Sequence, residues 1–139
     1  MRVRRDRNRS RHCSGAVAVE LAFVLPIFIT LAFAQIESAR LCQVVQLLTT
    51  AARQGARVAV IPGKAQADVQ TAVNTVLSSA GITVGTVNPT PTTWQTDPGG
   101  TLITVSISIP YSQVAWMSPS MFFGSTVLTG SATLSSERP

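Results

Sequence analysis

The pattern of apolar and polar residues changes several times along the chain, and the first pattern is a long apolar run. Residues 16–34 are apolar with few exceptions, and the run holds one carboxylate, Glu20. At about 1.5 Å per helical residue, this run spans roughly 28 Å, close to the thickness of the hydrocarbon of a bilayer. Pro26 lies inside it, and membrane-spanning helices tolerate proline. We therefore predict a transmembrane helix over residues 16–36.

A second pattern begins at Gln35, where apolar residues recur in steps of three and four with charges between them. This periodicity is typical of an amphipathic helix. The apolar positions are Ile36, Ala39, Val44, Leu47, Leu48, Ala51, Ala52, Gly55, Ala56 and Ala59. Pro62 and Gly63 are a strong stop signal. The sequence predicts one continuous helix that leaves the membrane and ends near Val60. Its small residues allow a close neighbour, which is either the rest of the chain, the favoured interpretation, or another subunit.

A second, shorter helix is expected from about Lys64 to Ala80. Its apolar residues share one face, and Gly81 is placed to cap its carboxyl end. The residues of that face are Val69, Val73, Val76, Leu77 and Ala80.

The remaining chain has the two-residue alternation of β-strands. Residues 102–111 alternate apolar and hydroxyl side chains, and residues 126–136 follow the same period. Ile82–Val87 is a third expected strand, followed by a proline-rich loop over Asn88–Gly100. Strands with one polar face indicate a small antiparallel sheet packed on helices. The predicted class is α+β, with about three strands.

The net charge of +5 lies at the amino terminus. Residues 1–15 hold six arginines and one aspartate, and the charges of the other residues cancel. Arginines beside a membrane span keep that end in the cytoplasm. We therefore expect a basic cytoplasmic leader over 1–15 and an extracytoplasmic domain over 37–139. Because the arginines adjoin an apolar segment, this role is favoured over binding of nucleic acid.

The sequence gives no support for catalysis, a metal or a cofactor. The one histidine, His12, lies in the leader, and the acids Glu37, Asp68, Asp97 and Glu137 are scattered. Cys13 and Cys42 flank the apolar run, so an intrachain disulfide is not expected, and two cysteines are too few for a zinc site. We predict neither an enzyme nor a binder of small molecules.

Three interpretations of the amino terminus remain open. A secretory signal peptide would use Ala32-Phe33-Ala34 as its cleavage site before Gln35. A plain anchor would stay uncleaved. In the third interpretation, cleavage after Gly15 frees the amine of Ala16, which lies about one helical turn from Glu20 and pairs with that carboxylate in its own or a neighbouring subunit. A simpler alternative for Glu20 is an acid tolerated near the lipid headgroups.

The third arrangement resembles the class III signal of type IV pilins, and a longer set of motifs is similar to the TadE-like pseudopilins of the tight-adherence (Flp) pilus. The similarity covers Gly15–Leu41 and Leu47–Val60, where AARQGAR resembles the AAREGAR stretch of that family. The segments ITVSISIPYSQV and LTGSATLSSERP are similar to its C-terminal strand motifs, VTVxYPY and LTxSATMRxE.

The resemblance implies a single-pass protein of the bacterial cytoplasmic membrane that acts as a minor pseudopilin or assembly component of a tight-adherence pilus or type II-type secretion system. Its implied partners are a prepilin peptidase cutting between Gly15 and Ala16, other pseudopilins and assembly-platform proteins. Glu20 is the implied assembly carboxylate. The alternative is a secreted or anchored envelope protein that binds a partner without a pilus role.

Two further groups are candidates for partner binding. Arg53 and Arg57 lie four residues apart on one predicted helix face, where a solvated surface is the simpler explanation. Trp116, Phe122 and Phe123 lie in an apolar segment between the last two strands, where core packing is the simpler explanation.

Overall fold

The structure is a computed structural model that describes residues 11–84, 86–115 and 126–137. It contains the helices α1 (Arg11–Ala59) and α2 (Gln66–Ser78), the 3-10 turn η1 (Tyr111–Gln113), and the strands β1 (Pro89–Thr90), β2 (Leu102–Pro110) and β3 (Val127–Ser135). Two compact units divide the chain, Met1–Ile36 and Glu37–Pro139, and α1 contributes to both. The predicted α+β class is confirmed, with a long apolar helix, a short helix and three antiparallel strands.

Over residues 15–36 of the first unit, the surface of α1 is apolar except at Glu20, Thr30 and Gln35. Large side chains such as Phe23 and Ile27 are 75% and 72% exposed. The helix continues through Pro26, and Thr30 Oγ1 donates a hydrogen bond to the Pro26 carbonyl at 2.8 Å. A helix that presents apolar side chains all round its surface is suited to lipid rather than to water.

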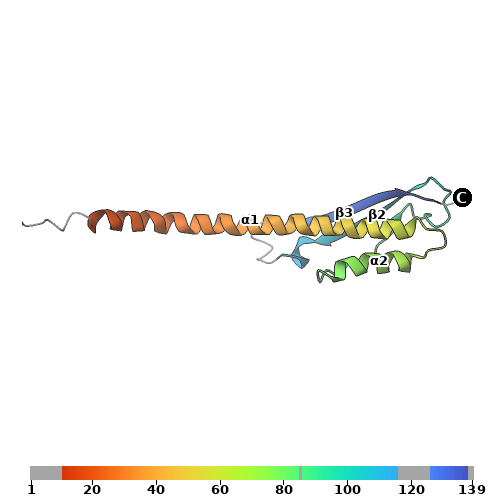
Figure 1. Cartoon of the computed structure of the whole chain (residues 1–139), viewed down its shortest axis with the longest axis horizontal. Coiled ribbons are helices and arrows are strands. Elements are labelled where there is room, and N and C mark those ends of the chain that lie inside the picture. The colour runs from red at the N-terminus through yellow and green to blue at the C-terminus, as the bar shows by residue number, and fades with distance from the viewer. Residues whose placement is uncertain (1–10, 85, 116–125, 138–139) are drawn as a thin grey trace, which may run out of the picture. The chain divides into compact units, whose positions relative to one another are not determined.

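In the second unit, two helices pack on one face of the sheet, whose strand order is β1-β2-β3 (Figure 1). The predicted alternation of β2 is confirmed, because its odd-numbered apolar residues are buried: Ile103, Val105, Ile107 and Ile109. The opposite face carries hydroxyl groups that pair across the strands. Thr104 and Thr133 are joined at 2.7 Å, and Ser108 and Thr129 at 3.1 Å.

The small residues of α1 allow its neighbours to approach closely. Its buried alanines have no exposed surface: Ala51, Ala52, Ala56 and Ala59. A Cβ at Gly55 would lie 2.8 Å from Val73 Cγ2 of α2. A Cβ at Gly130 of β3 would lie 2.5 Å from backbone atoms of Leu48 and Thr49. The small-residue stripe therefore serves packing within the chain, as predicted.

The shorter helix also follows the sequence prediction. α2 occupies Gln66–Ser78, and its buried residues are Val69, Val73 and Leu77. The Asp68 side chain accepts a hydrogen bond from the Ala65 N–H at 3.0 Å, at the amino end of the helix. Gly81 follows the carboxyl end with φ +67°, a conformation that favours glycine.

The position of the third strand was predicted wrongly. The described residues of Ile82–Val87 are not a strand, and β1 lies instead at Pro89–Thr90, inside the expected loop, where it pairs with Val105 and Thr104. The reason lies in α2. Gln70 Oε1 accepts from the Val87 N–H at 2.7 Å, and Gln66 Nε2 donates to the Val87 carbonyl at 3.3 Å. Side chains of a helix thus bind the backbone groups that a strand would use.

Candidate functional site

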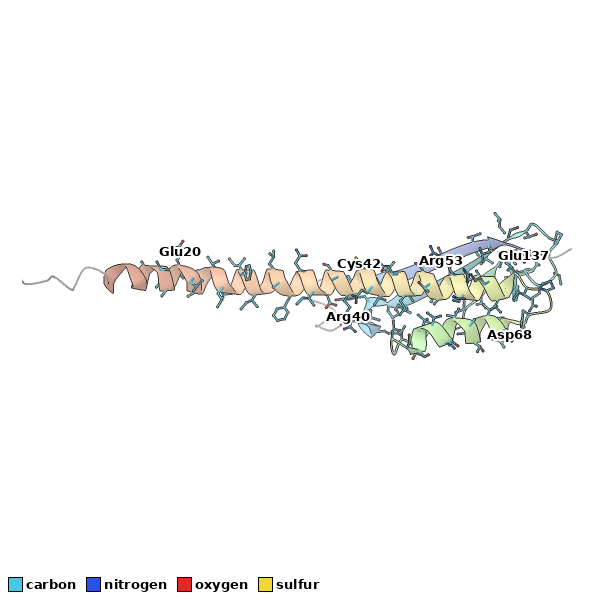
Figure 2. The ribbon with its side chains drawn as sticks, viewed as in Figure 1. Glu20, Arg40, Cys42, Arg53, Asp68 and Glu137 are labelled. Carbon is cyan, nitrogen blue, oxygen red and sulfur yellow. The ribbon has the colours of Figure 1, made fainter. Side chains whose placement is uncertain are left out.

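The predicted cleavage junction and assembly carboxylate lie on the exposed surface of α1 in the first unit. Gly15, Ala16 and Glu20 are all exposed, and a Cβ at Gly15 would meet no atom within 4 Å. Residues four apart on a helix are neighbours on its surface. The helix therefore places the Glu20 carboxylate beside the backbone of Ala16, and Figure 2 shows the side chain projecting from the ribbon.

The apolar part of α1 meets the requirements for a membrane span. Among the described residues, one helix is long and apolar enough to cross a bilayer, and its most apolar window is not buried in the protein. This fits a single-pass membrane protein.

The predicted partner-binding arginines belong to the second unit. Arg53 and Arg57 are exposed on α1 and line a cavity of about 320 Å³ with Ser131, Ala132, Thr133 and Leu134 of β3. Within the described part of the chain, neither guanidinium forms an ion pair or hydrogen bond.

A buried contact between Glu37 and Tyr111 was not predicted from the sequence. Glu37 is 2% exposed and Tyr111 is 1% exposed, and the tyrosine hydroxyl donates a hydrogen bond to Glu37 Oε1 at 2.6 Å. The hydrogen bond to the carboxylate, then burial, then the negative charge of Glu37 raise the pKa of Tyr111 from 10.0 to about 12. The pair connects α1 to η1, the turn that follows β2.

Two signals in the sequence point to this contact in retrospect. Tyr111 continues the buried odd-numbered series of β2, one step beyond Ile109. Glu37 begins the helical series that continues at Leu41, Val44 and Leu48, so both residues occupy positions that face the core.

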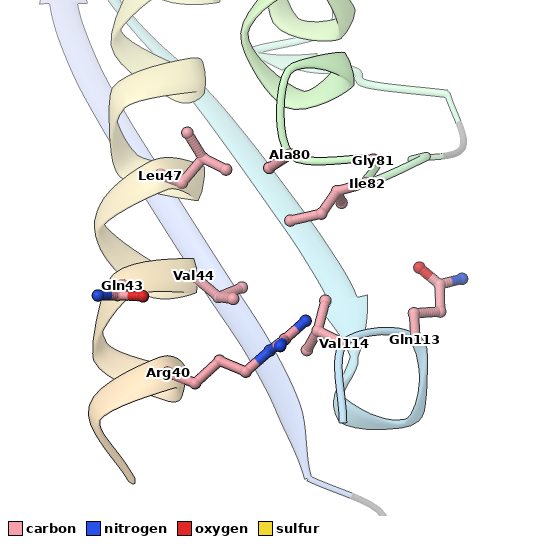
Figure 3. A pocket seen from close by; sticks show the side chains of 9 residues that line it. All are labelled: Arg40, Gln43, Val44, Leu47, Ala80, Gly81, Ile82, Gln113 and Val114. Atoms are coloured by element: carbon pink, nitrogen blue, oxygen red, sulfur yellow. The ribbon is translucent and has the colours of Figure 1, made fainter. Parts of the chain in front are cut away.

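A second cavity of about 320 Å³ lies between α1, the residues after α2, and η1 (Figure 3). Its polar side chains are Arg40, Gln43 and Gln113, and Val44, Leu47, Ile82 and Val114 supply most of its apolar wall. Among residues 11–84, 86–115 and 126–137, no group of His, Cys, Asp and Glu side chains could hold a metal ion.

The aromatic candidates Trp116, Phe122 and Phe123 lie outside the described residues, so their role stays a prediction. Trp94 is buried in the core and is 4% exposed, which makes it a packing residue.

Comparison with protein families supports the interpretation of the amino-terminal half. A family model described as TadE-like protein matches residues 15–57. Residues 15–57, the TadE-like region, are similar to this family. The matched residues include Gly15, Ala16, Glu20, Arg53 and Arg57, which confirms the predicted resemblance there. The C-terminal strand motifs lie beyond the match. The comparisons with curated proteins and with solved structures gave no match.

The TadE-like region and the apolar helix together fit a Tad pilus-associated protein with an N-terminal membrane-spanning helix.

Proposed function

We propose that this protein is a membrane-anchored minor pseudopilin or assembly component of a tight-adherence pilus or a related type II-type secretion system. The observation that carries the proposal is the position of Glu20. It is a carboxylate on the lipid-suited surface of α1, four residues after Ala16 and inside the TadE-like region. No catalytic activity is part of the proposed role.

The proposed role of Glu20 is electrostatic. A carboxylate is costly in hydrocarbon unless it is paired, so ionisable residues in membrane segments usually have a functional partner. Cleavage after Gly15 by a prepilin peptidase would give Ala16 a free ammonium group. Four residues of α-helix rise about 6 Å, so the amine and the carboxylate of neighbouring subunits can meet when the two helices lie in a fixed axial register. The ion pair would then select that register during assembly.

The proposed topology follows from the distribution of charge. The arginine-rich leader stays in the cytoplasm, because clustered arginines beside a membrane span resist translocation. The second unit, Glu37–Pro139, then lies outside the bacterial cytoplasmic membrane, where it can contact other pseudopilins and the assembly platform.

Co-purification of pilus components with Glu20 variants tests the assembly role. We expect Glu20→Ala to insert into the membrane at least as well as the natural chain, because it removes a charge from the apolar run, and to lose its association with other pseudopilins. Glu20→Asp should retain part of that association because it keeps the charge. Thr30→Ala, on the same apolar segment, is the matched control and should leave association unchanged. Equal recovery of partners with Glu20→Ala would contradict the proposed role.

A further inference from the structure

The strand β3 forms an edge of the sheet among the described strands and lacks three features that often protect such an edge: a charged residue, a proline and a bulge. It is nine residues long, contains no charged residue and no proline, and pairs with β2 through nine consecutive residues without a bulge. Within the described part of the chain, the sheet has the order β1-β2-β3, so no strand lies on the outer side of β3. Long, uncharged edges are templates for the addition of another strand.

Two cations lie beside this open edge. Arg53 and Arg57 of α1 line the 320 Å³ cavity with residues 131–134 of β3. The helix and the strand run in the same direction here. Leu48 and Thr49 of α1 lie beside Gly130 of β3, and the later residues Arg53 and Arg57 line the cavity with the later residues 131–134. An incoming strand at the outer edge of β3 would therefore pass both guanidinium groups.

We infer that this α1–β3 groove, formed by Arg53, Arg57 and residues 131–134, binds an extended acidic segment of another polypeptide. The segment adds to β3 as a further antiparallel or parallel strand through backbone hydrogen bonds. Two of its carboxylates, two positions apart, contact Arg53 and Arg57. The spacings agree, since four helical residues rise about 6 Å and two strand residues advance about 6.6 Å.

The charges favour an acidic partner over a second copy of this chain. Pairing of β3 with β3 of another copy would bring the arginines of both copies to one interface, and β3 carries no carboxylate to offset them. Like charges brought together across an interface disfavour association. A carboxylate-bearing strand supplies the opposite charge at the same place.

Binding of a synthetic peptide to the full chain in detergent micelles tests this inference. The probe has the length of β3, alternates valine and threonine, and carries two glutamates two positions apart; its affinity is measured by fluorescence anisotropy. We expect binding that weakens at higher ionic strength and falls by between about twofold and thirtyfold in the double variant Arg53→Gln/Arg57→Gln, the loss expected for two exposed ion pairs. Arg40→Gln, an arginine of α1 at the other cavity, is the matched control and should bind the peptide normally.

Three altered peptides separate strand addition from simple attraction of charge. In the first, the glutamates are adjacent, so they point to opposite faces of the strand, and the affinity should fall although the charge is the same. In the other two peptides, alternate backbone nitrogens are methylated, and each peptide has one of the two possible patterns. Strand addition uses the N–H groups of one edge, so one pattern should abolish binding and the other should preserve it.

Equal affinity for the spaced and adjacent glutamates, or equal effects of the two methylation patterns, would overturn the inference. Dimerisation of the natural chain that the acidic peptide does not displace would also overturn it, because a second copy would then occupy the edge. As a statement about a partner, the inference deepens the proposed assembly role and rests on it. The peptide assay requires neither cleavage at Gly15 nor Glu20, so failure of one proposal is distinguishable from failure of the other.

Discussion

The hydroxyl of Tyr111 lies 2.6 Å from Oε1 of Glu37 in the core of the second unit. The two residues are 74 positions apart in the chain, and their hydrogen bond joins α1 to the turn that ends β2. Glu37 is also the first residue of this unit. The contact therefore fixes the start of the folded unit to its central strand.

The ionisation of Tyr111 gives a direct measurement of this contact. Tyr111 is the one tyrosine of the chain, so the ultraviolet absorbance of tyrosinate reports on it alone. We expect a pKa of about 12 in the folded protein, and a pKa closer to 10.0 in Glu37→Gln, which removes the carboxylate that raises it. A natural chain that titrates at the ordinary tyrosine value would show that the contact does not form.

The raised pKa of Tyr111 also predicts how stability depends on pH. Above pH 10.0 the unfolded chain loses the phenol proton, whereas the folded chain keeps it until about pH 12. The contribution of Tyr111 to the free energy of unfolding is therefore constant below pH 10 and falls between pH 10 and 12. Urea unfolding in micelles, followed by the fluorescence of the tryptophans, measures this change. Tyr111→Phe should lack this fall, and an identical alkaline profile for both proteins would contradict the prediction.

Gly130→Ala should destabilise the second unit strongly. The added Cβ would lie 2.5 Å from the backbone of Leu48 and Thr49, and backbone atoms in the middle of a helix cannot move aside as a flexible side chain can. Overpacking of this kind costs about 1–3 kcal/mol. Ser131→Ala, at the next and exposed position, should change the free energy of unfolding by less than about 0.5 kcal/mol. Equal unfolding midpoints for the two variants in urea would show that α1 does not approach β3 this closely.

The exposed thiol of Cys42 tests the orientation of the chain. Cys42 is free and exposed on α1, just beyond the predicted membrane span. In intact cells that carry the Cys13→Ser variant, we expect a membrane-impermeant maleimide to label Cys42 from outside the cytoplasmic membrane once the outer layers are made permeable. Labelling that requires lysis of the cytoplasmic membrane would place this part of the helix in the cytoplasm and contradict the predicted orientation.

The parts of the fold that depend on local pattern were predictable from the sequence. The alternation of Ile103, Val105 and Ile107 predicted the buried face of β2, and Pro62 marked the end of α1. The position of β1 was not predictable in this way. Val87 lies in a segment whose apolar and β-branched residues are typical of a strand. The side chains of Gln66 and Gln70 bind its backbone groups instead of a neighbouring strand, and this is a tertiary effect.

The candidate sites show the same difference between features set by local spacing and features set by tertiary contacts. The spacing of Ala16 and Glu20 is local, so the sequence alone placed them on one helix surface. The pairing of Glu37 with Tyr111 and the position of Arg53 and Arg57 beside the open edge of β3 depend on contacts between distant segments. The spacing of residues puts Glu37 and Tyr111 at positions that face the core, but only the packed fold brings the two side chains together.

The amino-terminal sequence of the mature protein, determined on the chain purified from its own membrane, tests the central claim most directly. Cleavage between Gly15 and Ala16 predicts a protein that begins with Ala16 and retains the whole apolar run, with the new ammonium group one helical turn from Glu20. A protein that begins with Met1 or with Gln35 would contradict the claim, because no free amine would then lie beside Glu20.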